Sequence, residues 1–140
     1  MFWDSSAVVP ILVPDTRSTT LAALLRSDPE PVFWWASPVE CQSALHRQHR
    51  EDALPRTVLS EALARLQALA EDADFVAPTN RVRERAARLL AAHPLRAADA
   101  LQLAAALVWC DEAPQGISFV CLDERLRGAA RREGFGVTPV

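Results

Sequence analysis

The chain begins Met1-Phe2-Trp3-Asp4-Ser5-Ser6-Ala7-Val8-Val9, an apolar run that contains a single aspartate. Its aromatic and β-branched residues predict a first strand over residues 1–9. Aspartate is rare in strands, and a charge inside a buried strand is costly unless it is paired or binds a metal. A strand also offers Asp4 no helix to cap. We therefore expect a functional role for Asp4.

Short apolar strands alternate with helices along the rest of the chain, which predicts an α/β fold. The run 117–122 is continuously apolar, as in strands buried inside parallel sheets. The helix expected over residues 96–110 is apolar on most sides and should also be buried. We predict one domain, residues 1–140, built as a three-layer α/β/α sandwich around a mostly parallel sheet.

The remaining boundaries come from capping and turn residues. Further strands are expected over residues 32–36, 74–78 and 135–138. Further helices are expected from Asp15 or Thr16 to Leu25, from Ser37 to about Arg50, from Pro55 onward, from Thr79 or Asn80 to about Ala92, and over 124–133 with Gly134 ending the last.

Three more acids lie at the starts of predicted elements: Glu40, Asp99 and Asp123. Ligands bind beyond the carboxyl ends of the strands in such sheets, where Asp4 and Asp123 are expected. Four carboxylates gathered there would repel one another, and a hard divalent cation with oxygen ligands relieves that repulsion. This set therefore indicates metal-dependent phosphoryl chemistry.

Each of these three acids also has a purely structural interpretation. Glu40 fits a capping box with Ser37, in which its carboxylate would bond the Ser37 amide. Asp99 lies in the first turn of a helix, where a negative charge meets the positive end of the helix dipole. Asp123 can cap the helix that follows it. For Asp99 the two interpretations are evenly balanced, whereas for Glu40 and Asp123 taken alone the structural one is favoured.

Composition bounds the chemistry only loosely. The net charge is −3, so no overall basic field indicates a nucleic-acid binder. All fifteen basic residues are arginine, and their clusters can either contact phosphate or form solvated helix faces. The three cysteines have no metal-ligand spacing and suit a reducing cytoplasm. No signal peptide or apolar span long enough to cross a membrane is evident, so we expect a cytoplasmic protein.

Taken in order, the four acids and their neighbours resemble the PIN-domain nucleases, and among them the VapC-like toxins of bacterial type II toxin–antitoxin pairs. The resemblance covers nearly the whole chain. It rests on Asp4-Ser5-Ser6-Ala7, Glu40 on an early helix, Leu95-Arg96-Ala97-Ala98-Asp99-Ala100, and Phe119-Val120-Cys121-Leu122-Asp123-Glu124-Arg125-Leu126. No single motif is specific, but the ordered set is.

The resemblance implies that Asp4, Glu40, Asp99 and Asp123 form a catalytic metal site for Mg²⁺ or Mn²⁺. It implies an endoribonuclease that hydrolyses RNA phosphodiester bonds with metal-activated water. Its partners would be an RNA substrate, a cognate antitoxin and a second copy in a homodimer. Ser6 matches the family's hydroxyl residue and would orient the Asp4 carboxylate or a metal-bound water, although a backbone hydrogen bond is an equally good explanation. Cys121 departs from the pattern, since a hydroxyl residue is common there.

Two other classes were weighed against this one. Phosphoaspartyl folds also place an aspartate at a strand end, but they need a lysine near the site and this chain has none. A PIN-like fold could also bind RNA or a partner protein without cutting. All four acids are present, so the sequence gives no reason to think that the site is degenerate.

Overall fold

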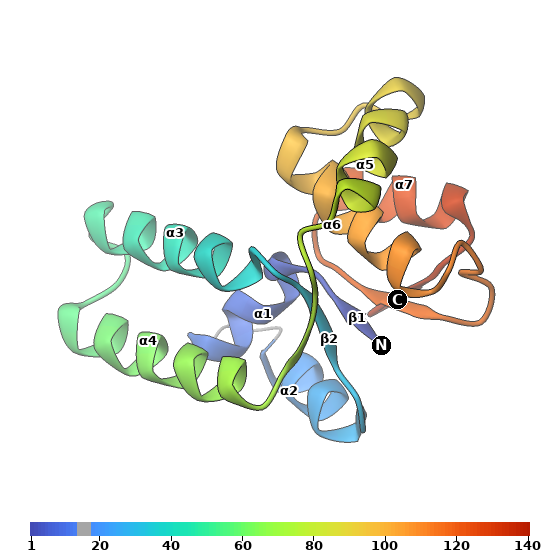
Figure 1. Ribbon diagram of the computed structural model, residues 1–140. Coiled ribbons are helices and arrows are strands. Elements are labelled where there is room, and N and C mark those ends of the chain that lie inside the picture. Colours follow the sequence, from blue (N-terminus) through green and yellow to red (C-terminus); the bar gives the residue numbers. More distant parts are fainter. Residues whose placement is uncertain (14–17) are drawn as a thin grey trace.

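The computed structural model describes residues 1–13 and 18–140. Within these residues the chain forms a five-stranded sheet flanked by helices on both faces (Figure 1). The strands are β1 (Phe2–Trp3), β2 (Val32–Trp34), β3 (Asp74–Val76), β4 (Ser118–Val120) and β5 (Gly136–Thr138). The helices are α1 (Ser5–Leu12), α2 (Ser18–Ser27), α3 (Ser37–Arg50), α4 (Arg56–Glu71), α5 (Asn80–Ala92), α6 (Ala97–Trp109) and α7 (Glu124–Glu133).

The strand order is β3-β2-β1-β4-β5, and all four neighbouring pairs are parallel. This confirms the predicted three-layer sandwich. The chain adds β2 and β3 on one side of β1 before it crosses to β4 on the other side. In open α/β sheets such a reversal leaves a crevice outside the carboxyl ends of the two central strands, here β1 and β4.

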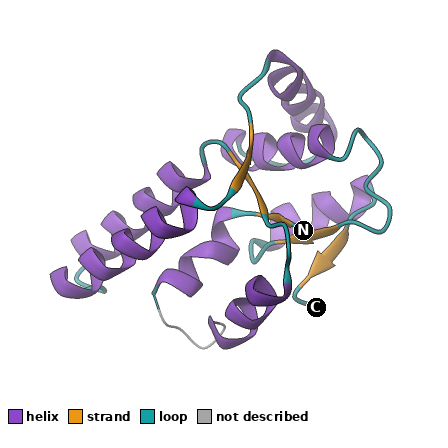
Figure 2. Cartoon of the chain, turned by 60° about the horizontal axis from the view of Figure 1, so that its bottom comes forward, coloured by secondary structure: helices purple, strands orange, loops and turns teal. Residues whose placement is uncertain are grey.

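Helices cover both faces of the sheet because its strands are apolar on both sides. Phe2 packs into the core under α5, α6 and α7, whereas its neighbour Trp3 packs into the core under α1 to α4. Phe119 and Val120 of β4 alternate in the same way and pair with Phe2 and Trp3. Figure 2 shows the strands running between the two groups of helices.

The first strand is much shorter than predicted. It ends at Trp3, and Asp4 is the N-cap of α1, with its carboxylate accepting the Ser6 N–H at 3.0 Å. The expectation of a strand over residues 1–9, with no helix for Asp4 to cap, was wrong. The apolar side chains Ala7 and Val8 are buried as predicted, but they lie on a helix that packs against α3.

The other elements follow the predictions with small shifts. Three strands end two residues earlier than expected, at positions 34, 76 and 120. The middle of helix α6, from Ala100 to Leu107, is buried except for the half-buried Leu101, as its apolar composition predicted. Gly134 ends α7 in the left-handed conformation, at φ 107°. The predicted caps Asp15 and Thr16 lie outside the described residues.

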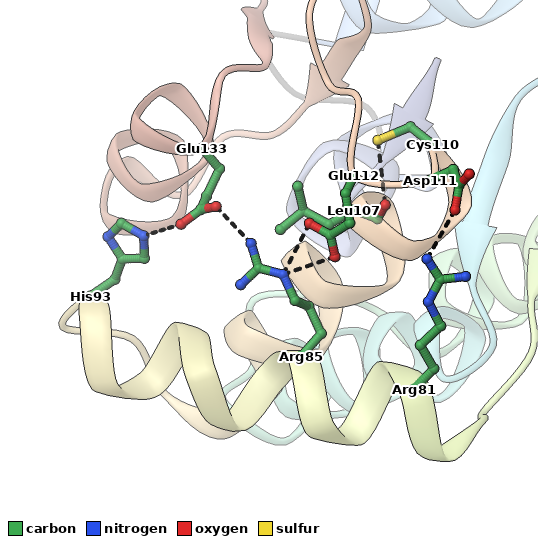
Figure 3. A network of polar contacts seen from close by, with 8 residues as sticks. All are labelled: Arg81, Arg85, His93, Leu107, Cys110, Asp111, Glu112 and Glu133. Atoms are coloured by element: carbon green, nitrogen blue, oxygen red, sulfur yellow. Dashed lines mark hydrogen bonds and ion pairs between the residues drawn. The ribbon is translucent and has the colours of Figure 1, made fainter.

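Ion pairs join α5 to the turn after α6 and to the end of α7 (Figure 3). Arg85 bonds Glu112 at 2.9 Å and Glu133 at 2.8 Å, and His93 Nε2 contacts Glu133 at 2.7 Å. Burial pushes the pKa of Glu133 upward, but hydrogen bonds from His93 and Arg85 outweigh it and hold the pKa below its usual value. The described contacts of His93 thus give it a structural role.

Candidate active site

The acids are held at the carboxyl edge of β1 and β4. Asp4 follows β1 directly, Asp123 lies three residues after β4, and Glu40 and Asp99 lie near the starts of α3 and α6. Burial is the main reason why the pKa values of Asp4 and Glu40 are raised, and the charge of Asp99 adds a smaller upward contribution to each. Asp123 in turn raises the pKa of Asp99. The topology therefore brings residues that are far apart in sequence to one site.

Asp4 is the most deeply buried of these carboxylates, with 5% of its surface exposed. Burial raises its pKa above the usual value, and hydrogen bonds from Ser6 and Cys121 only partly offset this. The Cys121 thiol lies 3.5 Å from Asp4 Oδ2, and burial together with the Asp4 charge raises the thiol pKa. A buried, protonated thiol beside Asp4 can donate a weak hydrogen bond but does not act as a nucleophile.

Ser6 connects the segments that follow the two central strands at this edge. Its hydroxyl donates a short hydrogen bond to Asp4 Oδ2. The same oxygen accepts the backbone N–H of Leu122 at 2.9 Å and that of Asp123 at 3.3 Å. Ser6 therefore makes both kinds of contact expected from the sequence: its hydroxyl bonds the Asp4 carboxylate and also accepts backbone N–H groups.

Glu40 points into the site and is not part of a capping box. The N-cap of α3 is Ala36, one residue earlier than predicted, and the described residues provide that cap with no side-chain hydrogen bond. Glu40 therefore lies one position too far into the helix to reach back to the cap. Its Oε2 accepts the Ser5 hydroxyl at 3.0 Å. Burial raises the pKa of Glu40, with smaller contributions from the charges of Asp4 and Asp99.

Gln102 is a site residue that the sequence analysis missed. It is 1% exposed, and its Nε2 lies 2.8 Å from Ser5 Oγ, 3.0 Å from Ser37 Oγ and 3.3 Å from Glu40 Oε2. It thus connects α6 with α1 and α3. Two signals were available: an amide in an otherwise apolar helix, and a spacing of three residues from Asp99 that puts both on one helix face.

Asp99 and Asp123 are the more accessible acids. Asp99 is half-buried, and its Oδ2 accepts the Arg96 N–H at 3.3 Å, so it does interact with the start of α6. Burial raises its pKa, while Arg125 and Arg96 act in the opposite direction. Asp123 is exposed and caps α7 through a 2.8 Å bond from the Leu126 N–H. The structural interpretations of these two acids hold, and neither excludes a second role.

An open groove of about 520 Å³ reaches this site. Glu40 and Asp99 line it together with the hydroxyls of Ser5, Ser6 and Ser43. Asp4 lies behind Ser6 and is not among the lining residues. The groove is therefore polar at one end, where a substrate could approach Glu40 and Asp99.

The carboxylate oxygens of the acids are suitable ligands for a hard divalent cation, but they do not surround one binding position. Across residues 1–13 and 18–140, no three His, Cys, Asp or Glu side chains are gathered closely enough to hold a metal as they stand. Magnesium is usually bound through one or two carboxylates and keeps several waters. Mutually repelling carboxylates around an open groove suit that mode of binding.

A family model described as the PIN domain matches residues 1–132. The chain belongs to the PIN domain family. PIN domains are nuclease-type domains that generally depend on divalent metals, so membership indicates a hydrolase that acts on nucleic acid. A search of curated proteins found no match to the chain. None of the described helices is long and apolar enough to cross a membrane.

Proposed function

We propose that this PIN domain is a divalent-metal-dependent endoribonuclease with Asp4, Glu40, Asp99 and Asp123 as its catalytic acids. The observation that carries the proposal is that acids from separate elements meet at the strand-order reversal, where Asp4 directly follows β1 and Glu40 and Asp99 line one groove. Structural charges are usually paired with cations. Glu40 instead faces a groove beside another acid, with neutral hydrogen-bond partners, at a cost that binding a cation would relieve.

The two carboxylates that line the groove, Glu40 and Asp99, would hold Mg²⁺ or Mn²⁺ directly, with Asp4 and Asp123 completing the charge around it. The bound metal would supply a nucleophilic water and offset the negative charge that develops on the phosphate. The protein's own part is to keep these carboxylates oriented. Ser6 fixes Asp4, while Ser5 and Gln102 fix Glu40.

The same resemblance to VapC-like toxins supports a biological role as the toxin of a toxin–antitoxin pair in the cytoplasm. The proposal includes a cognate antitoxin that inhibits the nuclease and a homodimeric assembly. Growth should slow when the protein is expressed alone and recover when the antitoxin is supplied. Unimpaired growth at high expression of the wild type would argue against a toxin.

A non-catalytic RNA- or protein-binding module is the second candidate. It is favoured by the absence of a ready-made cluster of three metal ligands among the described residues. The two candidates differ in one assay, in which purified protein is incubated with RNA and Mn²⁺. The enzyme should cleave RNA, and EDTA or Asp4→Asn should stop it. Binding without cleavage would favour the module.

A further inference from the structure

The acidic groove continues along the protein beyond the carboxylates. A second hollow of about 250 Å³ adjoins it between α1 and α3 and extends to Gln48. Four residues line both hollows: Ser6, Val9, Ala44 and Arg47. The two hollows therefore form one track, which starts at the acids and passes Arg47.

Arg47 lies on the same face of α3 as Glu40. The two are seven residues apart, which is two helical turns and about 10 Å along the axis. Ser43 and Ala44 lie between them at the spacing that keeps one helix face continuous, and all four line the larger hollow. The helix thus presents an anion at one end of the track and a cation further along it.

The Arg47 guanidinium is free to bind a ligand. Its side chain is exposed and forms no ion pair or hydrogen bond within the described parts of the chain. Arg81 and Arg85, in contrast, are each paired with acids at 2.9 Å. An arginine that lines a groove without a partner is suited to bidentate contact with a phosphate.

A chain of phosphates matches both ends of this track. One phosphate would meet the acids through the divalent cation, and another would meet Arg47 directly. Neighbouring phosphates of one strand are farther apart than the axial rise of about 3.4 Å per nucleotide, so a span of about 10 Å corresponds to about one or two nucleotides.

We propose that Arg47 binds the backbone of the same RNA strand, about one or two nucleotides from the bond that is cut. This inference rests on the proposed nuclease function and adds a substrate path between α1 and α3. It makes Arg47 a determinant of affinity for strands that extend past the cut bond toward Arg47, with no part in bond cleavage itself.

The test measures binding of a fluorescein-labelled, phosphorothioate-linked single-stranded RNA of 12 nucleotides by anisotropy, with Mn²⁺ present. Arg47→Gln should weaken binding about tenfold at low salt, the loss of one charge-assisted contact. It should also reduce the slope of log K against log salt by about 0.7. The matched control is Arg50→Gln, which removes an exposed arginine of the same helix that lines neither hollow.

The outcomes separate this inference from the proposed function. If the wild type binds and cleaves RNA but Arg47→Gln behaves like Arg50→Gln, the inference is overturned and the nuclease stands. If the wild type neither binds nor cleaves, both fail together. If Arg47→Gln lowers the melting temperature, Arg47→Lys decides: restored affinity supports the phosphate contact, and affinity as weak as that of Arg47→Gln overturns it.

Discussion

Replacing Ser6 by alanine tests how the site is held together. The hydroxyl accepts two backbone N–H groups, from Leu122 and Asp123, and donates to the buried Asp4 carboxylate. Each neutral hydrogen bond contributes about 1 kcal/mol, and a bond to a charged group about 2 kcal/mol. Alanine is a slightly better helix former, which recovers a few tenths of a kcal/mol. The 3.3 Å bond to Asp123 is long, so we expect a net loss of about 3 kcal/mol.

The loss should appear in metal-free urea unfolding followed by tryptophan fluorescence. With a slope of about 2 kcal/mol per M, the midpoint should fall by about 1.5 M. The control is Ser43→Ala, which removes an exposed hydroxyl that makes no hydrogen bond in the described structure; its midpoint should move by less than about 0.3 M. If Ser6→Ala and Ser43→Ala shift the midpoint equally, Ser6 does not connect the segments after the two central strands as described.

Three further predictions concern charge and burial. Mn²⁺ should raise the melting temperature of the wild type and much less that of Asp99→Asn, because metal binding stabilises the native state by mass action; equal shifts in a thermal scan would contradict this. Burial raises the pKa of Asp4 above 3.8 in the folded protein. The stability that the protonated carboxyl contributes is therefore present below that pH and is lost as the pH rises and the group ionises. Asp4→Asn should therefore gain stability relative to the metal-free wild type between pH 4 and pH 7 in urea titrations, and a constant difference would refute the buried charge. Arg127→Met should cost about 3 kcal/mol, because the buried guanidinium bonds the carbonyl oxygen of Cys121 at 2.6 Å; a loss under about 1 kcal/mol would show that this contact is dispensable.

The sheet could be predicted from the sequence because its strands are apolar on both faces. Residues 118–120 are flanked by turn residues and have no helical period, so a buried parallel strand was the simplest solution. Helix α6 was equally clear, since its apolar residues extend round most of its surface. In both elements local composition and tertiary burial point to the same structure.

The start of the chain was mispredicted because its local signals conflict. Val8 and Val9 favour a strand by intrinsic preference, yet they lie on a helix in which Val8 packs into the core. The Asp4-Ser5-Ser6 sequence is also a good helix start, because aspartate caps helices well. An apolar run cannot by itself show where a buried strand gives way to a buried helix.

The acids could be selected from sequence, but their partners could not. Glu40 matched a capping-box spacing, and only the position of Ala36 as the actual cap showed that its carboxylate is free for the site. Gln102 contacts Ser5 and Ser37, which are 97 and 65 residues away, and no local pattern records such contacts. Side-chain networks of this kind depend on how helices pack, which the sequence pattern leaves open.

The central claim is that Glu40 serves a metal site and does not cap a helix, and RNA cleavage by Glu40→Gln tests it most directly. Glutamine keeps the oxygen that accepts the Ser5 hydroxyl, so the metal-free fold should change by less than about 1 kcal/mol. It lacks the negative charge that a divalent cation needs, so Mn²⁺-dependent cleavage should fall by at least about 100-fold. Cleavage by Glu40→Gln at the wild-type rate would contradict the account, and the site would reduce to Asp4, Asp99 and Asp123.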